Sequence, residues 1–122
     1  MKIAITTNGQ DLDGQVDPRF GRCGGFLVVD TDSMTFDIVP NPNAAVGGGA
    51  GIQSAQLLAN QDVKAVLTGN CGPNAFQTLQ AAGVDVFTGV SGVVRDAVEQ
   101  YKSGAFTVDG QSNVGSHFGT SW

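Results

Sequence analysis

The stretch VKAVLTGNCGPNAFQTLQAAGVDVFT, residues 63–88, decides the fold class. Its first six residues are rich in apolar side chains and predict a buried strand over 63–68. Pro73 fits the first turn of a helix and Gly83 fits the position just after its end, so we expect a helix that ends near residue 82. A second apolar run predicts a strand over 84–88. Because strand–helix–strand crossovers are right-handed, the two strands should run parallel.

The sequence upstream of this unit predicts three more strands. They are expected over 2–7, 26–30 and 35–39. Asp32 and Ser33 are typical of a hairpin turn, so the last two strands should be antiparallel. The three strands together predict an antiparallel meander.

Helical spacing of apolar residues predicts a further helix over 52–60, and Ser91 is expected to cap a last helix that ends at Gly104. The element order is therefore β-β-β-α-β-α-β-α. This order predicts an α/β fold of three layers, α/β/α, with a mixed five-stranded sheet. We expect one domain over residues 1–105 and a flexible C-terminal tail over 106–122.

Composition excludes several classes of protein. The chain has 122 residues, of which 41% are apolar and 14% are charged, and this rules out a disordered chain. No apolar run approaches the roughly 20 residues of a membrane span. The net charge of −5, without a cluster of Lys or Arg, argues against nucleic-acid binding. Because the sequence enters a strand pattern at once, without a leader, we expect a cytoplasmic protein.

Four loops are expected at one edge of the sheet. In the predicted topology the strands before residues 8–25, 41–51, 69–72 and 89–92 all run in the same direction. These loops hold thirteen of the 18 glycines. Ligands of open α/β sheets usually bind at this edge.

The same edge predicts an anion site. Three of the four loops lead into helices, whose amino ends present free N–H groups and a partial positive charge. The fourth loop carries Arg19 and Arg22, two of only six basic residues. Glycine allows such backbone to approach a ligand closely.

Each candidate residue also has a structural interpretation. The alternative interpretation of Asp17 to Arg22 is a turn with a local Asp–Arg ion pair and no role in binding. Cys71 is either a small buried hydrophobe or a thiolate whose pKa is lowered at a helix amino end. Cys23 is either a functional thiol or a merely buried one, and burial is the more common case for a free cysteine. His117 is either a solvated tail residue or an extra metal ligand. Gly47 to Gly49 could form a hinge.

The catalytic inventory is thin. The sequence has no P-loop, no G-x-G-x-x-G and no G-x-S-x-G, and its two cysteines are 48 positions apart without a C-x-x-C pair. With a single histidine, an assembled nucleophile and base are not expected. The site is therefore predicted to hold an anion rather than to transform one.

Several motifs resemble one known family. They are Asp17-Pro18-Arg19-Phe20-Gly21-Arg22-Cys23, Gly48-Gly49…Gly51-Ile52-Gln53, Thr68-Gly69-Asn70-Cys71-Gly72-Pro73-Asn74-Ala75 and Thr88-Gly89-Val90-Ser91-Gly92. As a set, they are similar to the dinitrogenase iron–molybdenum cofactor accessory family, which includes NifX-like proteins and the C-terminal domain of NifB. The resemblance covers nearly all of residues 1–105.

The resemblance implies a ribonuclease H-like fold and a carrier rather than an enzyme. Family members hold iron–sulfur or iron–molybdenum–sulfur cofactors and their precursors. The sequence looks closest to a branch that holds an anionic molybdenum–copper sulfide cluster. The resemblance also implies a MinD/Mrp-like P-loop ATPase as an alternative partner, with the protein then acting as a regulator that carries no cluster.

The residues that we expect at the cluster come from the four loops. The cofactor-binding candidates are Arg19, Arg22, Cys23, Gly48, Gly49, Asn70, Cys71, Gly72, Gly89 and Ser91. The candidates for direct metal ligation are Cys71 and His117.

Overall fold

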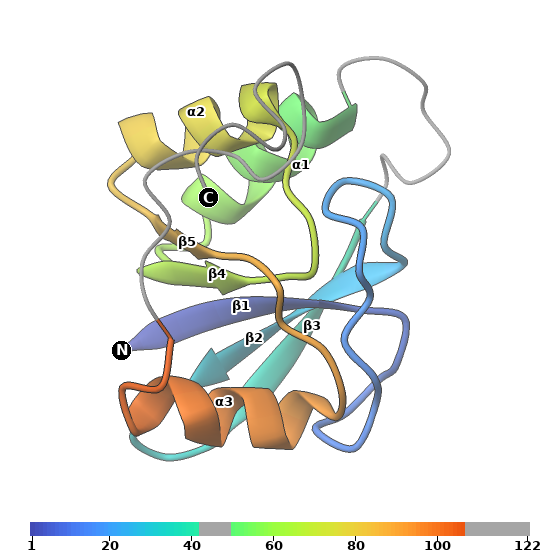
Figure 1. The fold of residues 1–122 in the computed structure, drawn as a ribbon, viewed down its shortest axis with the longest axis vertical. Coiled ribbons are helices and arrows are strands. Elements are labelled where there is room, and N and C mark those ends of the chain that lie inside the picture. The colour runs from blue at the N-terminus through green and yellow to red at the C-terminus, as the bar shows by residue number, and fades with distance from the viewer. Residues whose placement is uncertain (42–49, 107–122) are drawn as a thin grey trace.

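The computed structural model describes residues 1–41 and 50–106 of the chain, and its elements follow the predicted order (Figure 1). The elements are β1 (Lys2–Thr7), β2 (Gly25–Asp30), β3 (Phe36–Pro40), α1 (Ala50–Ala59), β4 (Ala65–Leu67), α2 (Pro73–Ala81), β5 (Asp85–Phe87) and α3 (Val94–Lys102). Pro73 begins α2, and Gly83 follows its end with φ +78°, as predicted.

The five strands form one mixed sheet in the order β3-β2-β1-β4-β5. β1 pairs with β2 and β2 with β3 in antiparallel fashion, whereas β1 pairs with β4 and β4 with β5 in parallel. The predicted mixed sheet is therefore confirmed. β1, β3, β4 and β5 run in one direction, so their carboxyl ends lie at the same edge of the sheet.

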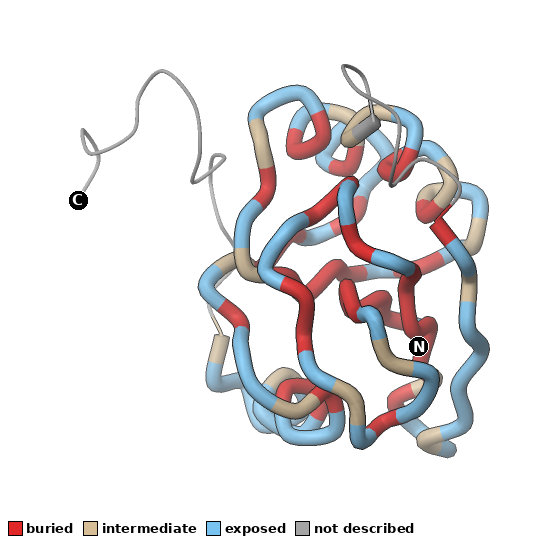
Figure 2. The backbone as a smooth tube through the Cα atoms, turned by 90° about the vertical axis from the view of Figure 1, so that its right-hand side faces the viewer, coloured by how far each residue is buried: buried red, intermediate tan, exposed pale blue. Residues whose placement is uncertain are grey.

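Helices cover both faces of the sheet, with α1 and α2 on one side and α3 on the other (Figure 1). Each face has its own buried apolar cluster. Ala4, Phe26 and Val28 point toward α1 and α2, and Ile5, Leu27 and Val29 point toward α3. Figure 2 shows these buried strands between helices whose outer sides are exposed. Successive side chains of a strand point to opposite faces of the sheet. The consecutive apolar residues of β1 and β2 therefore contribute in turn to one cluster and then to the other.

Several predicted boundaries were wrong. β4 and β5 are limited to three residues each, because only Ala65–Leu67 and Asp85–Phe87 pair in the ladder. α1 begins at Ala50 rather than at residue 52. Ser91 does not cap α3, because the helix begins at Val94 and its N-cap is Val93, which makes no side-chain cap bond.

Some predicted features lie outside the described residues. Gly48, Gly49 and His117 are among them, as is all of the predicted flexible tail except Phe106. Phe106 is partly buried against the cluster under α3, and its ring centroid lies 6.2 Å from that of Phe87. No helix in the described ranges is long and apolar enough to cross a membrane.

Candidate functional site

The β1–β2 loop (residues 8–24) contacts the segments that follow β4 and β5 at the carboxyl-end edge of the sheet, which we call the loop edge. Isolated bridges join Arg19 to Asn70 and Gln15 to Val93. The Phe20 N–H donates to Asn70 O at 3.1 Å, and the Asn70 side-chain amide donates to Pro18 O at 3.1 Å. Segments that follow β1, β4 and β5 are thus in direct contact, as the topology predicted.

A cleft of about 180 Å³ opens at this edge between the amino ends of α1 and α2. Its lining consists of Phe20, Gly51, Ile52, Gly72, Pro73, Asn74 and Ala75. The two first turns are close, since a Cβ on Gly51 would lie 3.2 Å from Ala75 Cβ. None of the described lining residues is acidic. The cleft is smaller than the roughly 300 Å³ of pockets that hold organic ligands, so it suits a compact ligand.

The amino end of α2 offers unpaired hydrogen-bond donors to this cleft. Its N-cap is Gly72, there is no side-chain cap, and the first turn contains no acidic residue. Pro73 has no N–H, so the donors at this end are the Asn74 and Ala75 amides, for which the described residues supply no acceptor. A helix amino end in this condition attracts anions.

Gly72 itself leaves space that the fold does not need. Its φ of −70° and ψ of 167° suit any residue, and a Cβ at this position would meet nothing within 4 Å. Gly69, in contrast, is required by packing, because its Cβ would lie 2.6 Å from Pro18 Cα. The open side of Gly72 therefore gives a ligand access to backbone rather than relieving a clash.

The amino end of α3 is different. The Val94 N–H donates to Gly14 O and the Arg95 N–H donates to Leu12 O, each at 2.8 Å. The first turn also contains the carboxylate of Asp96. The sequence predicts that three helix ends serve an anion site, but at this one the β1–β2 loop already takes the first two amide donors.

Gly89 and Ser91 precede α3. The Gly89 N–H donates to Gly69 O at 2.9 Å. The φ of Gly89 is +73°, a left-handed backbone conformation that glycine adopts without strain, so the turn itself accounts for a glycine here. Ser91 is exposed and does not line the cleft. The structure therefore ties Gly89 to the loop edge by a backbone bond, while Ser91 stays apart from the cleft.

A buried carboxylate anchors the loop that carries Phe20. Asp17 Oδ1 accepts from the Arg19 N–H at 2.8 Å and from Arg19 Nε at 3.4 Å, and Oδ2 accepts from the Asn8 amide. Burial raises the pKa of Asp17, but these hydrogen bonds and the Arg19 charge outweigh it and hold the pKa below its ordinary value. The Asp17–Arg22 turn therefore combines the predicted ion pair with a buried anchor.

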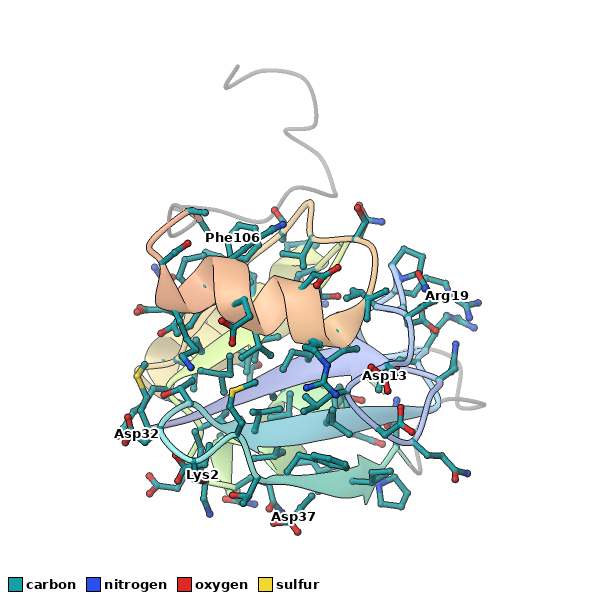
Figure 3. All side chains as sticks on the ribbon, turned by 90° about the horizontal axis from the view of Figure 1, so that it is seen from below. Lys2, Asp13, Arg19, Asp32, Asp37 and Phe106 are labelled. Carbon is teal, nitrogen blue, oxygen red and sulfur yellow. The ribbon has the colours of Figure 1, made fainter. Side chains whose placement is uncertain are left out.

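The two arginines supply the positive charge of the β1–β2 loop. The Arg19 side chain is 60% exposed, although its Nε is paired with Asp17, and Arg22 is also exposed. Figure 3 shows Arg19 projecting outward at the edge where β3 ends. The exposed part of the guanidinium can therefore contact a ligand while the Arg19 Nε stays bonded to Asp17.

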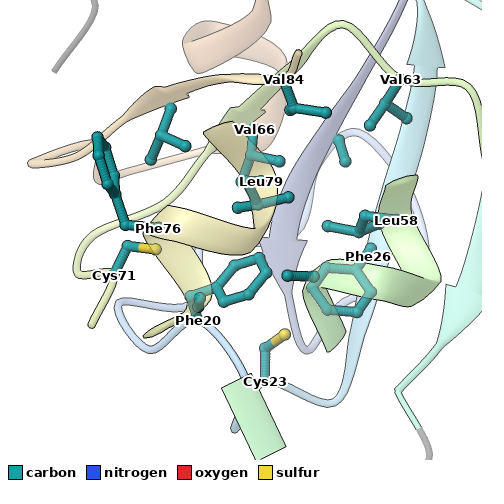
Figure 4. Packing of buried hydrophobic residues seen from close by; sticks show 14 of the residues in the cluster. Phe20, Cys23, Phe26, Leu58, Val63, Val66, Cys71, Phe76, Leu79 and Val84 are labelled. Atoms are coloured by element: carbon teal, nitrogen blue, oxygen red, sulfur yellow. The ribbon is translucent and has the colours of Figure 1, made fainter. Parts of the chain in front are cut away.

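Both cysteines are fully buried in the apolar cluster under α1 and α2. Figure 4 shows them with Phe20 and Phe26, whose ring centroids are 5.7 Å apart. Burial, together with the charge of Asp17, raises the pKa of Cys23 to about 11. Cys23 is therefore a protonated thiol at neutral pH, and the packing reading describes its position in this structure. Cys71 Sγ lies 3.7 Å from Gly72 O, directly below the N-cap of α2.

Sequence reasoning missed several residues of the site. Phe20, Ile52 and Asn74 line the cleft, and Pro73-Asn74 could have been identified because they form the predicted first turn of a helix. Asn41 is a further residue that the sequence analysis does not single out. Its amide donates to Gly21 O and Cys23 O, both at 3.0 Å, and no local pattern signals these contacts.

No group of three or more His, Cys, Asp or Glu residues within residues 1–41 and 50–106 could hold a metal ion. The described part of the cleft thus offers N–H donors rather than a ligand cage, and the two exposed arginines lie on the β1–β2 loop outside its lining. Such donors suit an anion that brings its own metal ligands.

Comparisons with known proteins agree with this fold. Residues 1–104 match the family described as dinitrogenase iron–molybdenum cofactor. The apo form of the orange protein from Desulfovibrio gigas is similar at a TM-score of 0.89 and 44% identity, over 93% of this chain and 96% of that one. The solution structure of a proposed NifB protein from Thermotoga is similar at a TM-score of 0.75 and 32% identity, over 94% and 95% of the two chains. An uncharacterized protein of Methanocaldococcus jannaschii is 29% identical over 107 residues, which cover 85% of this chain and 87% of its own.

Proposed function

Because this chain belongs to the dinitrogenase iron–molybdenum cofactor family, we propose that it is a non-catalytic carrier of an anionic metal–sulfur cluster. The cluster that we favour is a molybdenum–copper sulfide, which the sequence resemblance implies and which the likeness to the orange protein supports. The observation that carries the proposal is the cleft between the amino ends of α1 and α2, whose described lining contains no carboxylate.

The donors at the cleft match the chemistry of such a cargo. A metal sulfide carries its negative charge on sulfur, and the Asn74 and Ala75 amides can donate to it at the positive end of α2. Arg19 and Arg22 add positive charge from the neighbouring loop. A cluster that brings its own sulfides needs few protein ligands, which fits a Cys23 thiol that stays protonated.

Reconstitution tests this proposal. Apo-protein treated with tetrathiomolybdate and a copper salt should acquire a visible charge-transfer band, and molybdenum and copper should remain with it after gel filtration. The variant Arg19→Ala with Arg22→Ala should lose more metal than Lys64→Ala with Lys102→Ala, which removes the same charge elsewhere. Colourless, metal-free protein, or equal losses in the two double variants, would contradict the proposal.

A second candidate cargo is the iron–molybdenum cofactor or an iron–sulfur precursor. The likeness to the proposed NifB protein of Thermotoga favours this candidate. Metal analysis of protein purified from its native host separates the two, since iron accompanies only the second cargo.

The third candidate is the cluster-free regulator of a MinD/Mrp-like ATPase. In that case, a pull-down from native extract should recover the ATPase with metal-free protein. Retention of metal by the purified chain would contradict this alternative.

A further inference from the structure

The outer edge of the sheet is apolar where it is exposed. β3 is the last strand on its side, and Phe36 and Ile38 are 37% and 40% exposed. They lie opposite Val29 and Leu27 in the register, so all four side chains share the α3 face. α3 buries the two residues of β2 but leaves those of β3 partly uncovered.

The backbone of β3 has free groups at this edge. The Asp30 N–H donates to Thr35 O at 2.9 Å, and the Asn41 N–H donates to Gly24 O at 3.1 Å. Hydrogen-bonded and non-hydrogen-bonded pairs alternate in an antiparallel ladder. These two bonds therefore show that the backbone N–H and C=O groups of the odd-numbered residues of β3 point toward β2. The N–H and C=O groups of Phe36 and Ile38 therefore point outward, and no described residue pairs with them. Pro40 is tolerated because its missing N–H would also point outward.

We propose that β3 pairs with β3 of a second copy of this chain, antiparallel and centred on Ile38. Each Ile38 would exchange both of its backbone hydrogen bonds with its mate, and each Phe36 N–H would donate to Pro40 O of the other copy. A two-fold axis through the Ile38 pair maps each strand onto the other, so both copies use the same surface, as a symmetric dimer requires. It joins the two sheets and places the exposed side chains of both copies in one apolar row on the α3 face.

The charge of Asp37 and the chemistry of Pro40 select this register over its neighbours. A shift that centres the pair on Asp37 keeps the outward hydrogen bonds but places the two Asp37 carboxylates directly opposite one another, which is destabilising. A shift that centres the pair on Val39 pairs Ile38 with Pro40, which has no N–H to return. In the Ile38 register, Asp37 faces Val39 of the other copy. Figure 3 shows Asp37 at the outer rim of the sheet.

The strand has only five residues, so the interface is small and the dimer should be weak. Sedimentation over about 10 µM to about 1 mM should show the average mass rising from one chain toward two. Ile38→Lys places two ammonium groups opposite one another and should weaken association at least about tenfold. Gln80→Lys, its matched control, adds the same charge at an exposed position of α2 and should change association by less than about twofold. A wild-type chain that stays monomeric throughout, or an Ile38→Lys variant that associates as the wild type does, would overturn the proposal.

Cysteine cross-linking tests the register directly. Opposed residues of a bonded antiparallel pair have Cα atoms about 5.5 Å apart, within the range of a disulfide. Under mild oxidation Ile38→Cys should give a covalent dimer, whereas Phe36→Cys should not, because the Phe36 residues of the two copies are offset along the strands. Cys23 and Cys71 are buried and should leave the wild type unlinked. Equal cross-linking of the two variants, or none in Ile38→Cys, would overturn the Ile38-centred pairing.

Discussion

The amino ends of α2 and α3 occupy similar positions in the fold but differ in their contacts. Each helix has nine residues, follows a parallel strand and lacks a side-chain N-cap bond. The β1–β2 loop gives its Leu12 and Gly14 carbonyls to α3, whereas it gives the apolar side chain of Phe20 to the cleft beside α2. We therefore expect an anion site only at a helix end whose amide donors the chain leaves unused.

The largest effect should come from filling the space beside Gly72. Gly72→Leu suits the backbone at this position but occupies the cleft, so cluster affinity should fall at least about 100-fold, or about 2.7 kcal/mol. Ala82→Leu is the matched control, because it adds the same side chain at the exposed carboxyl end of α2. Retained metal and thermal melting measure the two effects. Equal retention in both variants would place the cluster elsewhere.

Both buried thiols lie on the face of the sheet that α1 and α2 cover, and neither lies on the α3 face. Cys23 has a pKa raised from 9.0 to about 11 in the fold, so the folded state holds its proton more tightly than the unfolded chain does. The stabilisation is present in full below pH 9 and is lost as the pH rises through 11. Urea unfolding should show a loss of about 2 kcal/mol between these limits that Cys23→Ala lacks. Identical alkaline slopes would show that Cys23 is not held as a buried thiol.

A carboxylate introduced at the amino end of α2 should give this end a negative charge in its first turn, as α3 has. Asn74→Asp should stabilise the apo-protein by about 0.3–1 kcal/mol through the helix dipole. The same charge should repel the anionic cluster and weaken its binding about tenfold. Denaturant unfolding and cluster titration measure the two changes. Unchanged affinity would mean that the cluster does not approach this end.

The reverse change at α3 should have the smallest effect. Asp96→Asn removes the carboxylate from the first turn and should cost about 0.3–1 kcal/mol of stability. Cluster affinity should stay as in the wild type, because the Val94 and Arg95 amides remain bonded to the β1–β2 loop. A gain in affinity would show that α3 competes for the ligand.

The fold was predictable because its signals are local. Short apolar runs located the five strands, and Pro73 and Gly83 set the start and end of α2. The start of α3 was not predictable from Ser91, because the helix is capped by a carbonyl of Gly14, which is distant in the sequence.

The candidate site was predictable to the level of an edge, not of its contacts. Asn70 and Gly72 were placed at the edge from the sequence, and the structure puts Gly72 in the cleft. The depth of Asp17 and of the two thiols depends on packing between loops that periodicity cannot report. The roles of these residues at a cluster stay a prediction.

The most direct measurement of the central claim is an amide NMR titration of the labelled apo-protein with tetrathiomolybdate and copper. The account predicts that the Asn74 and Ala75 amides shift as the visible band appears, while the Val94 and Arg95 amides stay in place. Shifts concentrated at Val94 and Arg95, with Asn74 and Ala75 unmoved, would contradict it.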